Sequence, residues 1–229
     1  ELDTHGIDYV YHYFDLRHLD FGDLPWVGVL TDLLGKLDTA RHTASDLDTA
    51  IETNLGGLDF FTETYARDAD LSYAAPALVV GASALAEKVD ALATLPSEVW
   101  GTTRFDDLAR VRDILTQRRV ALEQYFVSSG HTAATARANT YFSSAAMASS
   151  AMSGLEYYLF LRDLLDGWDE RASALPGRLA ELAARVFTAD DVVVSFTGSA
   201  ESRARFWEAG GMLGLERTGC AERRLAVPT

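Results

Sequence analysis

The stretch IDYVYHYFDL, residues 7–16, constrains the fold more than any other part of the sequence. Tyr9 and Tyr11 occupy odd-numbered positions, which share one face of an extended strand. Val10 and Phe14 occupy even-numbered positions, which share the other face. Alternating aromatic and β-branched residues are typical of a β-strand, and apolar side chains on both faces indicate a strand inside a sheet. The chain must therefore supply further strands to pair with both edges of this one.

The remaining sequence supplies those strands and helices to cover them. Apolar runs at 58–66 and 74–85, joined by the acidic turn RDAD, predict a hairpin, and DVVVSFTG at 191–198 predicts a last strand. Helical spacing predicts helices at 25–37, 43–55, 85–95 (ending before Pro96), 105–126, 131–149, 155–166 and 176–187. This order predicts an α+β fold, a largely antiparallel sheet flanked by helices. We expect one domain over 1–198, then a terminal helix and the start of a linker over 199–229.

Composition limits the class of protein. The 229 residues are 48% hydrophobic and 24% charged, which is enough apolar material for a sizeable core. No apolar run approaches the ~20 residues that span a bilayer, and the first residues lack the basic start and apolar core of a signal peptide. We therefore expect a cytoplasmic protein without a membrane partner. The single cysteine, Cys220, excludes an internal disulfide.

The charge is negative and unevenly distributed. The formal net charge is −14, which argues against nucleic acid as a partner because phosphates would be repelled. Residues 1–100 hold 18 acids and 5 bases (−13), whereas residues 101–229 hold 16 acids and 15 bases (−1). The first part either keeps the protein in solution or produces a negative field that favours basic ligands.

Motifs of catalytic sites are missing from the sequence. None of the five histidines forms a His-x-x-Glu-His or His-x-x-x-His pair, although His12 and His18 could meet in space. There is no Gly-x-Ser-x-Gly elbow. VSFTGSAESR resembles a phosphate loop but lacks the Gly-Lys-Ser/Thr signature, which favours an ordinary turn between strand and helix. The residues alone do not support catalysis.

The stretch SSGHTAATARANTYFSSAAM, residues 128–147, gathers polar and aromatic groups at a predicted helix start. Ser128 or Ser129 is a candidate N-cap. Arg137 and Tyr141 lie four residues apart, so both point to one side of a continuous helix. Two interpretations are open for this pair: a surface ion pair with core packing, or a binding surface.

The segment order resembles the insulinase-like (pitrilysin-type) zinc metalloproteases, in particular the presequence-protease branch, over essentially the whole chain. The resemblance rests on GIDYVYHYFDLRHL with DLPWVGVLTDLLGKLDT, on IETNLGGLDFFTE, on SSGHTAATARANTYFSSAAMASSAMSGLEYYLFLRDL and on DVVVSFTG. The SSGH segment is the most specific, because Gly-His, Arg-Ala and Phe-Ser follow at the spacing of that branch.

The resemblance implies a place within a longer protein. Such proteases have four homologous α+β domains and bind zinc in the first through an inverted His-x-x-Glu-His helix and a distant glutamate. This chain looks like the third domain, in the non-catalytic half. Its segment at 23–39 places Val29, Asp32 and Leu33 where the His, Glu and His would stand, and aliphatic side chains cannot bind zinc. The resemblance thus implies no metal and no catalytic residue in this segment, with zinc in the parent's catalytic half.

The function implied is a wall and closure surface of a chamber that degrades short unstructured peptides. Its partners would be the catalytic half of the same polypeptide and those peptides. Arg137 and Tyr141 are the candidate residues facing the chamber, as a clamp on a peptide carbonyl or carboxylate and as a hydrogen-bond donor. The alternative is a self-standing inactive peptide-binding or scaffold subunit of the same superfamily. An independent enzyme that uses His131 is a third hypothesis.

Overall fold

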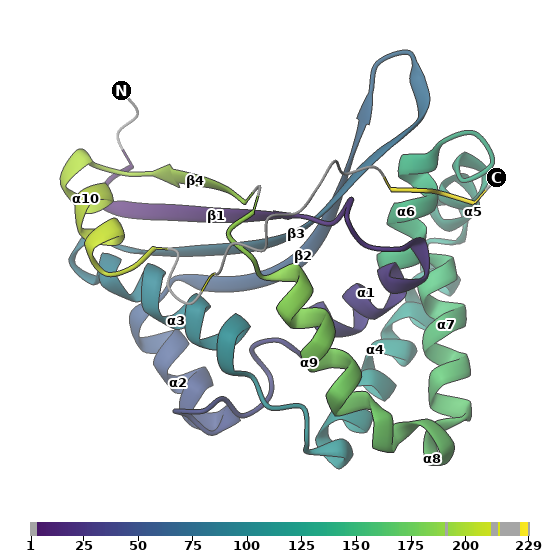
Figure 1. Cartoon of the computed structure of the whole chain (residues 1–229), viewed down its shortest axis with the longest axis horizontal. Coiled ribbons are helices and arrows are strands. Elements are labelled where there is room, and N and C mark those ends of the chain that lie inside the picture. The colour runs from purple at the N-terminus through teal and green to yellow at the C-terminus, as the bar shows by residue number, and fades with distance from the viewer. Residues whose placement is uncertain (1–3, 191, 212–214, 216–224, 229) are drawn as a thin grey trace.

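One antiparallel sheet organises the molecule (Figure 1). The computed structural model describes residues 4–190, 192–211, 215 and 225–228. Its strands are β1 (Ile7–Asp15), β2 (Gly57–Arg67), β3 (Asp70–Leu85) and β4 (Val193–Thr197). They lie in the order β2-β3-β1-β4 with antiparallel neighbours, which confirms the α+β fold and the internal position of the first strand.

Helices account for most of the remaining described chain. They are α1 (Leu24–Leu33), α2 (Ala44–Asn54), α3 (Val89–Thr102), α4 (Leu108–Ser128), α5 (Gly130–Asn139), α6 (Ser144–Ser153), α7 (Leu155–Asp166), α8 (Trp168–Arg171), α9 (Leu175–Val186) and α10 (Ala200–Glu208), with 3-10 turns at Phe21–Asp23, Ala86–Lys88 and Ala172–Ala174. The helix predicted at 43–55 is confirmed as α2, which is capped by Thr43: its hydroxyl accepts the N–H of Asp46 at 3.2 Å. The predicted order of strands is confirmed, but the chain between the hairpin and the last strand forms more helices than predicted.

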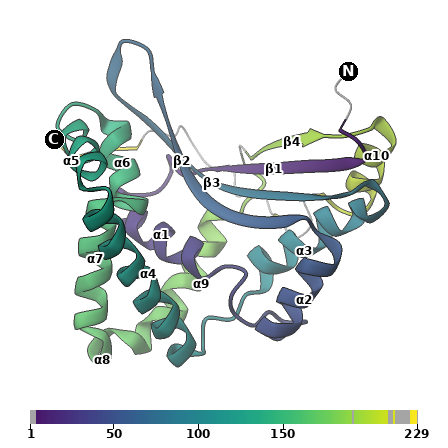
Figure 2. The ribbon, with the colours of Figure 1, turned by 180° about the vertical axis from the view of Figure 1, so that it is seen from behind.

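The helices cover one face of the sheet and leave the other open. In Figures 1 and 2, α1, α2, α3 and α9 lie together on one side of the strands. Val10, His12 and Phe14 of β1 point toward these helices and are buried, whereas Tyr9 and Tyr11 point away and are each 37% exposed. β1 therefore has apolar side chains on both faces, as predicted, but only one of its faces belongs to the core.

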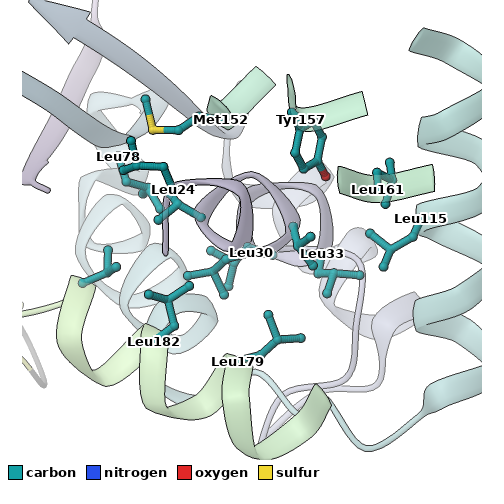
Figure 3. Packing of buried hydrophobic residues seen from close by; sticks show 14 of the residues in the cluster. Leu24, Leu30, Leu33, Leu78, Leu115, Met152, Tyr157, Leu161, Leu179 and Leu182 are labelled. Carbon is teal, nitrogen blue, oxygen red and sulfur yellow. The ribbon is translucent and has the colours of Figure 1, made fainter. Parts of the chain in front are cut away.

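Helix α1 lies at the centre of the main core (Figure 3). Its side chains contact three layers of neighbours: the sheet, the α6–α7 pair and the α4 and α9 helices. Figure 3 shows Leu24, Leu30 and Leu33 of α1 among residues of these elements, including Leu78, Leu115, Met152, Tyr157, Leu161, Leu179 and Leu182. A helix that is apolar around most of its circumference is expected at such a central position.

Gly28 sets the distance between α1 and the α6–α7 pair. A β-carbon at Gly28 would lie 2.3 Å from the carbonyl oxygen of Met152 and 2.7 Å from the ring of Tyr157. Both distances are far below van der Waals contact, and one of the two groups belongs to the backbone. The close packing of α1 therefore requires a residue without a side chain at this position.

The predicted helix end before Pro96 is wrong. Helix α3 continues to Thr102 with Pro96 inside it. A proline in a helix interior lacks the N–H donor and usually kinks or ends the helix. Here the residues beyond it, including Val99 and Trp100, are buried in the main core. Their burial outweighs the missing hydrogen bond.

The single helix predicted over 131–149 is two helices, α5 and α6, joined by a turn. The hydroxyl of Thr140 donates to the carbonyl of Arg137 at 2.7 Å, and the hydroxyl of Ser143 accepts the N–H of Ala146 at 3.3 Å. Side chains that bond to nearby backbone compete with helix continuation and favour caps. Tyr141 therefore lies in the turn.

The predicted helix start near residue 105 is also displaced. Helix α4 begins at Leu108, because the side chain of Asp107 accepts the N–H of Arg110 at 2.9 Å and caps it. Further along the chain, α10 lies within the range 199–229, where we expected a terminal helix followed by a linker. Most of the predicted linker, at 212–214, 216–224 and 229, lies outside the described residues. Leu225 is buried in the main core.

Candidate functional site

The three positions at which the resemblance would place a zinc motif, Val29, Asp32 and Leu33, lie on α1 and face the interior. Val29 and Leu33 are both 0% exposed and belong to the main core. Their side chains are surrounded by carbon atoms of other core residues. Neither has a lone pair to offer a metal.

Asp32, where the resemblance would place a glutamate, contacts two neighbouring side chains. The Tyr157 hydroxyl donates a hydrogen bond to Oδ2 at 2.5 Å, and the Arg118 Nε lies 3.2 Å from Oδ1. Burial raises the pKa of Asp32, while Arg118 and the hydrogen bond from Tyr157 act in the opposite direction. Burial also raises the pKa of Tyr157 well above its usual value, so its hydroxyl stays protonated and donates. These contacts tie α1 to α4 and α7.

The described residues offer no alternative place for a metal. Among them, no three or more His, Cys, Asp or Glu side chains gather closely enough to hold an ion. The Nε2 atoms of His12 and His18 instead lie 2.8 Å and 2.9 Å from the carbonyl oxygens of Gly211 and Arg185. Burial lowers the pKa of His12. The zinc that the resemblance implies for a parent protein therefore does not fit the residues described in this chain.

Arg137 and Tyr141, the predicted chamber residues, do lie together. The Arg137 guanidinium carbon is 5.2 Å from the centre of the Tyr141 ring, and Tyr141 is 73% exposed. The α5–α6 turn brings the two side chains together, whereas one continuous helix was predicted.

Arg137 also has a partner that the sequence did not indicate. Its guanidinium pairs with Glu156 at the start of α7 and donates to the hydroxyl of Thr140 at 3.3 Å. Glu156 in turn accepts a hydrogen bond from Ser150 of α6. The Arg137 side chain is 39% exposed, so one part of it is used within the molecule and another part remains accessible. No spacing rule points to Glu156, which lies 19 residues further along the chain.

A pocket of about 350 Å³ lies beside this ion pair. Its lining consists mainly of small side chains of α5 and α6 with two aromatic residues of α4, and comprises Tyr125, Phe126, Ala133, Ala136, Arg137, Asn139, Ala146, Ser149, Ser150, Ser153, Gly154 and Leu155. The surface beside Arg137 is thus hollowed between α4, α5 and α6. It is large enough for one or two side chains of a partner.

The predicted serine cap of the SSGH segment is wrong. Ser129 precedes α5 without a side-chain hydrogen bond to it, and the Ser128 hydroxyl donates back to the Tyr125 carbonyl at 3.3 Å. His131 is exposed, and its Nε2 lies 3.2 Å from the hydroxyl of the adjacent Thr132. The described contacts give His131 no buried carboxylate to orient it as a general base.

Comparisons with known proteins identify a family for the chain. The family model for the domain associated with M16 peptidases of subfamily C matches residues 1–164. Protein HypA of Clostridium perfringens is 28% identical over 208 residues, which is 91% of this chain and 21% of that protein. Presequence protease 1, chloroplastic/mitochondrial, of Arabidopsis thaliana is 26% identical over 205 residues, which is 88% of this chain and 19% of that protein. The mitochondrial presequence protease of Yarrowia lipolytica is 24% identical over 161 residues, 70% of this chain and 16% of that protein.

The fold has also been seen in a crystal structure of a conserved protein from Enterococcus faecalis V583. That structure matches 95% of this chain and 50% of its own with a TM-score of 0.62 and 11% identity, which shows a shared fold alone. No helix in the described part of the chain is both long and apolar enough to cross a membrane. The chain spans about a fifth of the length of the curated relatives it matches. It belongs to the family of domains associated with M16 peptidases of subfamily C, and its relatives include presequence proteases of the insulinase-like peptidases.

Proposed function

We propose that this chain is a non-catalytic domain of a zinc-dependent metalloendopeptidase that degrades short unstructured peptides. The observation that carries the proposal is the burial of Val29 and Leu33 in the core, at the positions where the resemblance places zinc ligands. A zinc peptidase needs a metal that activates water, and this helix uses the same positions for packing. The family and the presequence-protease relatives support the assignment to a peptidase.

The domain contributes a chamber wall and a closure surface. Enclosing a peptide excludes water and holds the scissile bond in place. A domain can do this with a contact surface alone and needs no reactive groups. The open sheet face and the α5–α6 pocket are accessible surfaces of this kind. The partner is the catalytic half of the same polypeptide, which carries the zinc.

Removing the segment tests this role. We expect a parent protein without residues 1–229 to lose at least about a hundredfold in kcat/KM for unstructured peptides, a loss typical of misplaced substrate. The measurement compares hydrolysis by the intact and shortened proteins at equal zinc content. Adding the 229-residue chain in trans serves as the control and should restore part of the rate. An unchanged rate in the shortened protein would remove the chamber role.

Arg137, with Tyr141 beside it, is proposed to contact the peptide. In the parent protein we expect Arg137→Ala to lower kcat/KM about tenfold, the effect of one charge-assisted hydrogen bond. The melting temperature of the 229-residue chain should change by only a few degrees, because the ion pair is partly exposed.

Glu156→Gln is the matched control for this substitution. It breaks the same ion pair but leaves the guanidinium in place. If Arg137 binds substrate, Glu156→Gln should leave kcat/KM within about twofold of the intact protein. Equal losses in both variants would mean that the Arg137–Glu156 pair has a structural role only.

A further inference from the structure

The open face of the sheet carries a row of aromatic side chains. Tyr9, Tyr11 and Tyr13 of β1 point away from the helices, and Phe61 of β2 lies on the same face across β3. Figures 1 and 2 show this side of the sheet without a helix over it in the described part of the chain. The strands hold these side chains in fixed positions, unlike aromatic residues of a loop.

Two of these rings, those of Tyr11 and Phe61, lie close to a glycine of β3. A β-carbon at Gly81 of β3 would lie 2.8 Å from the Tyr11 ring and 3.6 Å from the Phe61 ring. Gly81 stands directly between Tyr11 and Asp59 in the strand register. The missing side chain lets the rings lie low over the strand and leaves a hollow of about 170 Å³, lined by Tyr9, Tyr11, Gly57, Asp59, Phe61, Gly81, Ala82 and Ser83. We call this hollow the Gly81 notch.

Asp59 gives the Gly81 notch a negative charge. It is exposed and forms no ion pair with the part of the chain that the structure describes. Asp15 on the same face differs, because its carboxylate binds Arg17 at 2.6 Å. The guanidinium of Arg67, near the hairpin tip, lies 3.8 Å from the centre of the Tyr73 ring. The notch thus combines an unpaired carboxylate with aromatic rings.

We propose that the Gly81 notch binds one cationic side chain, arginine or lysine, of an extended peptide lying across the open sheet face. A cation gains from ring faces and from a carboxylate at once, because both attract positive charge. The proposal rests on the proposed peptide-degrading function and adds a surface and a side-chain preference to it.

Size and charge both fit this occupant. The notch is smaller than the ~300 Å³ of the smallest usual small-molecule pockets, so it fits one long side chain. An apolar side chain would cover Asp59 without neutralising it, which is unfavourable for a carboxylate. An anionic group would meet Asp59 and the net charge of −13 in residues 1–100.

The test uses the 229-residue chain and two unstructured peptides that differ at one residue, arginine or its uncharged analogue citrulline. Binding is measured by calorimetry and by backbone amide NMR shifts. We expect the arginine peptide to bind about tenfold more tightly at low salt, with shifts centred on residues 9–11, 59–61 and 81. Asp59→Asn should remove most of this difference, and Tyr11→Leu should reduce it severalfold.

Two control variants make comparable changes elsewhere. Asp48→Asn removes the same charge from an exposed position of α2, and Trp207→Leu removes an aromatic ring of similar exposure from α10. Neither should alter the preference for arginine. Unchanged melting temperatures in all four variants would exclude unfolding as the cause of any loss.

Three results would overturn the proposal: equal affinity for the two peptides, an equal effect of Asp59→Asn and Asp48→Asn, or shifts that map to the helical face. A fourth is that Asp59→Asn lowers the melting temperature of the parent protein without weakening peptide binding, which would assign the notch to the protein's own chain. These readouts need no peptidase activity. The proposal for the notch can therefore be refuted while removal of residues 1–229 still abolishes hydrolysis. Conversely, the notch can bind the arginine peptide even if removal of the segment leaves hydrolysis unchanged.

Discussion

Replacing Gly28 by alanine should destabilise the chain by about 2 to 4 kcal/mol, although alanine is the better helix former. Within a helix, Gly→Ala usually stabilises by about 0.5 to 1 kcal/mol. At Gly28 the new β-carbon would meet the Met152 carbonyl oxygen at 2.3 Å, and a backbone group cannot move aside as a flexible side chain does. The steric cost therefore exceeds the gain in propensity, and α1 must move away from α6.

Chemical denaturation of Gly28→Ala and of Gly101→Ala provides the measurement and its control. Gly101 lies in α3, and a β-carbon there meets nothing within 4 Å. We expect the unfolding midpoint of Gly101→Ala to stay unchanged or rise. If both variants unfolded at the midpoint of the unsubstituted chain, α1 would be packed less closely than described.

Introducing a zinc motif at residues 29–33 should strongly destabilise the chain instead of creating a metal site. The triple variant Val29→His, Asp32→Glu, Leu33→His puts two imidazoles into the core and lengthens the carboxylate that Arg118 and Tyr157 hold. Each buried polar group without a partner costs about 1 to 3 kcal/mol, and the lost apolar packing adds to this. We expect a total loss of at least about 4 kcal/mol, a large part of a typical stability of about 5 to 15 kcal/mol.

Thermal unfolding with and without zinc checks this expectation. A control variant, Asp113→His with Gln117→His, places two histidines at the same i, i+4 spacing on exposed positions of α4. It should bind zinc weakly without a loss of stability. If the triple variant kept its melting temperature and bound zinc stoichiometrically, α1 would be accessible and the non-catalytic role would lose its main support.

The sequence predicted the elements whose signals are local. The alternation in residues 7–16 and the acidic turn at 67–70 each lie within a few residues, and each led to the element now described. The break after Asn139 was missed because serine and threonine caps look like ordinary helix residues in an alanine-rich stretch. The helix end predicted before Pro96 was wrong because the residues beyond the proline are buried, and this burial depends on tertiary packing.

The candidate site could be predicted only in part, because its partners lie far apart in the sequence. Asp32 meets Tyr157 across 125 residues, and Arg137 meets Glu156 across 19. No periodicity connects such pairs. Alternation in β1 likewise indicated two apolar faces, but only the positions of the helices reveal which face stays open. In the sequence, Gly81 does not differ from any other strand glycine, because the Tyr11 ring that lies over it comes from another strand.

Helix α5 differs from its neighbours in how it is held. None of its residues, Gly130–Asn139, is buried, and the Arg137–Glu156 pair is its principal tie to α7. The free energy needed to open a segment locally depends mainly on the contacts that the segment buries. We therefore expect α5 to open locally while the core around α1 stays folded, so that its amides exchange with solvent without global unfolding.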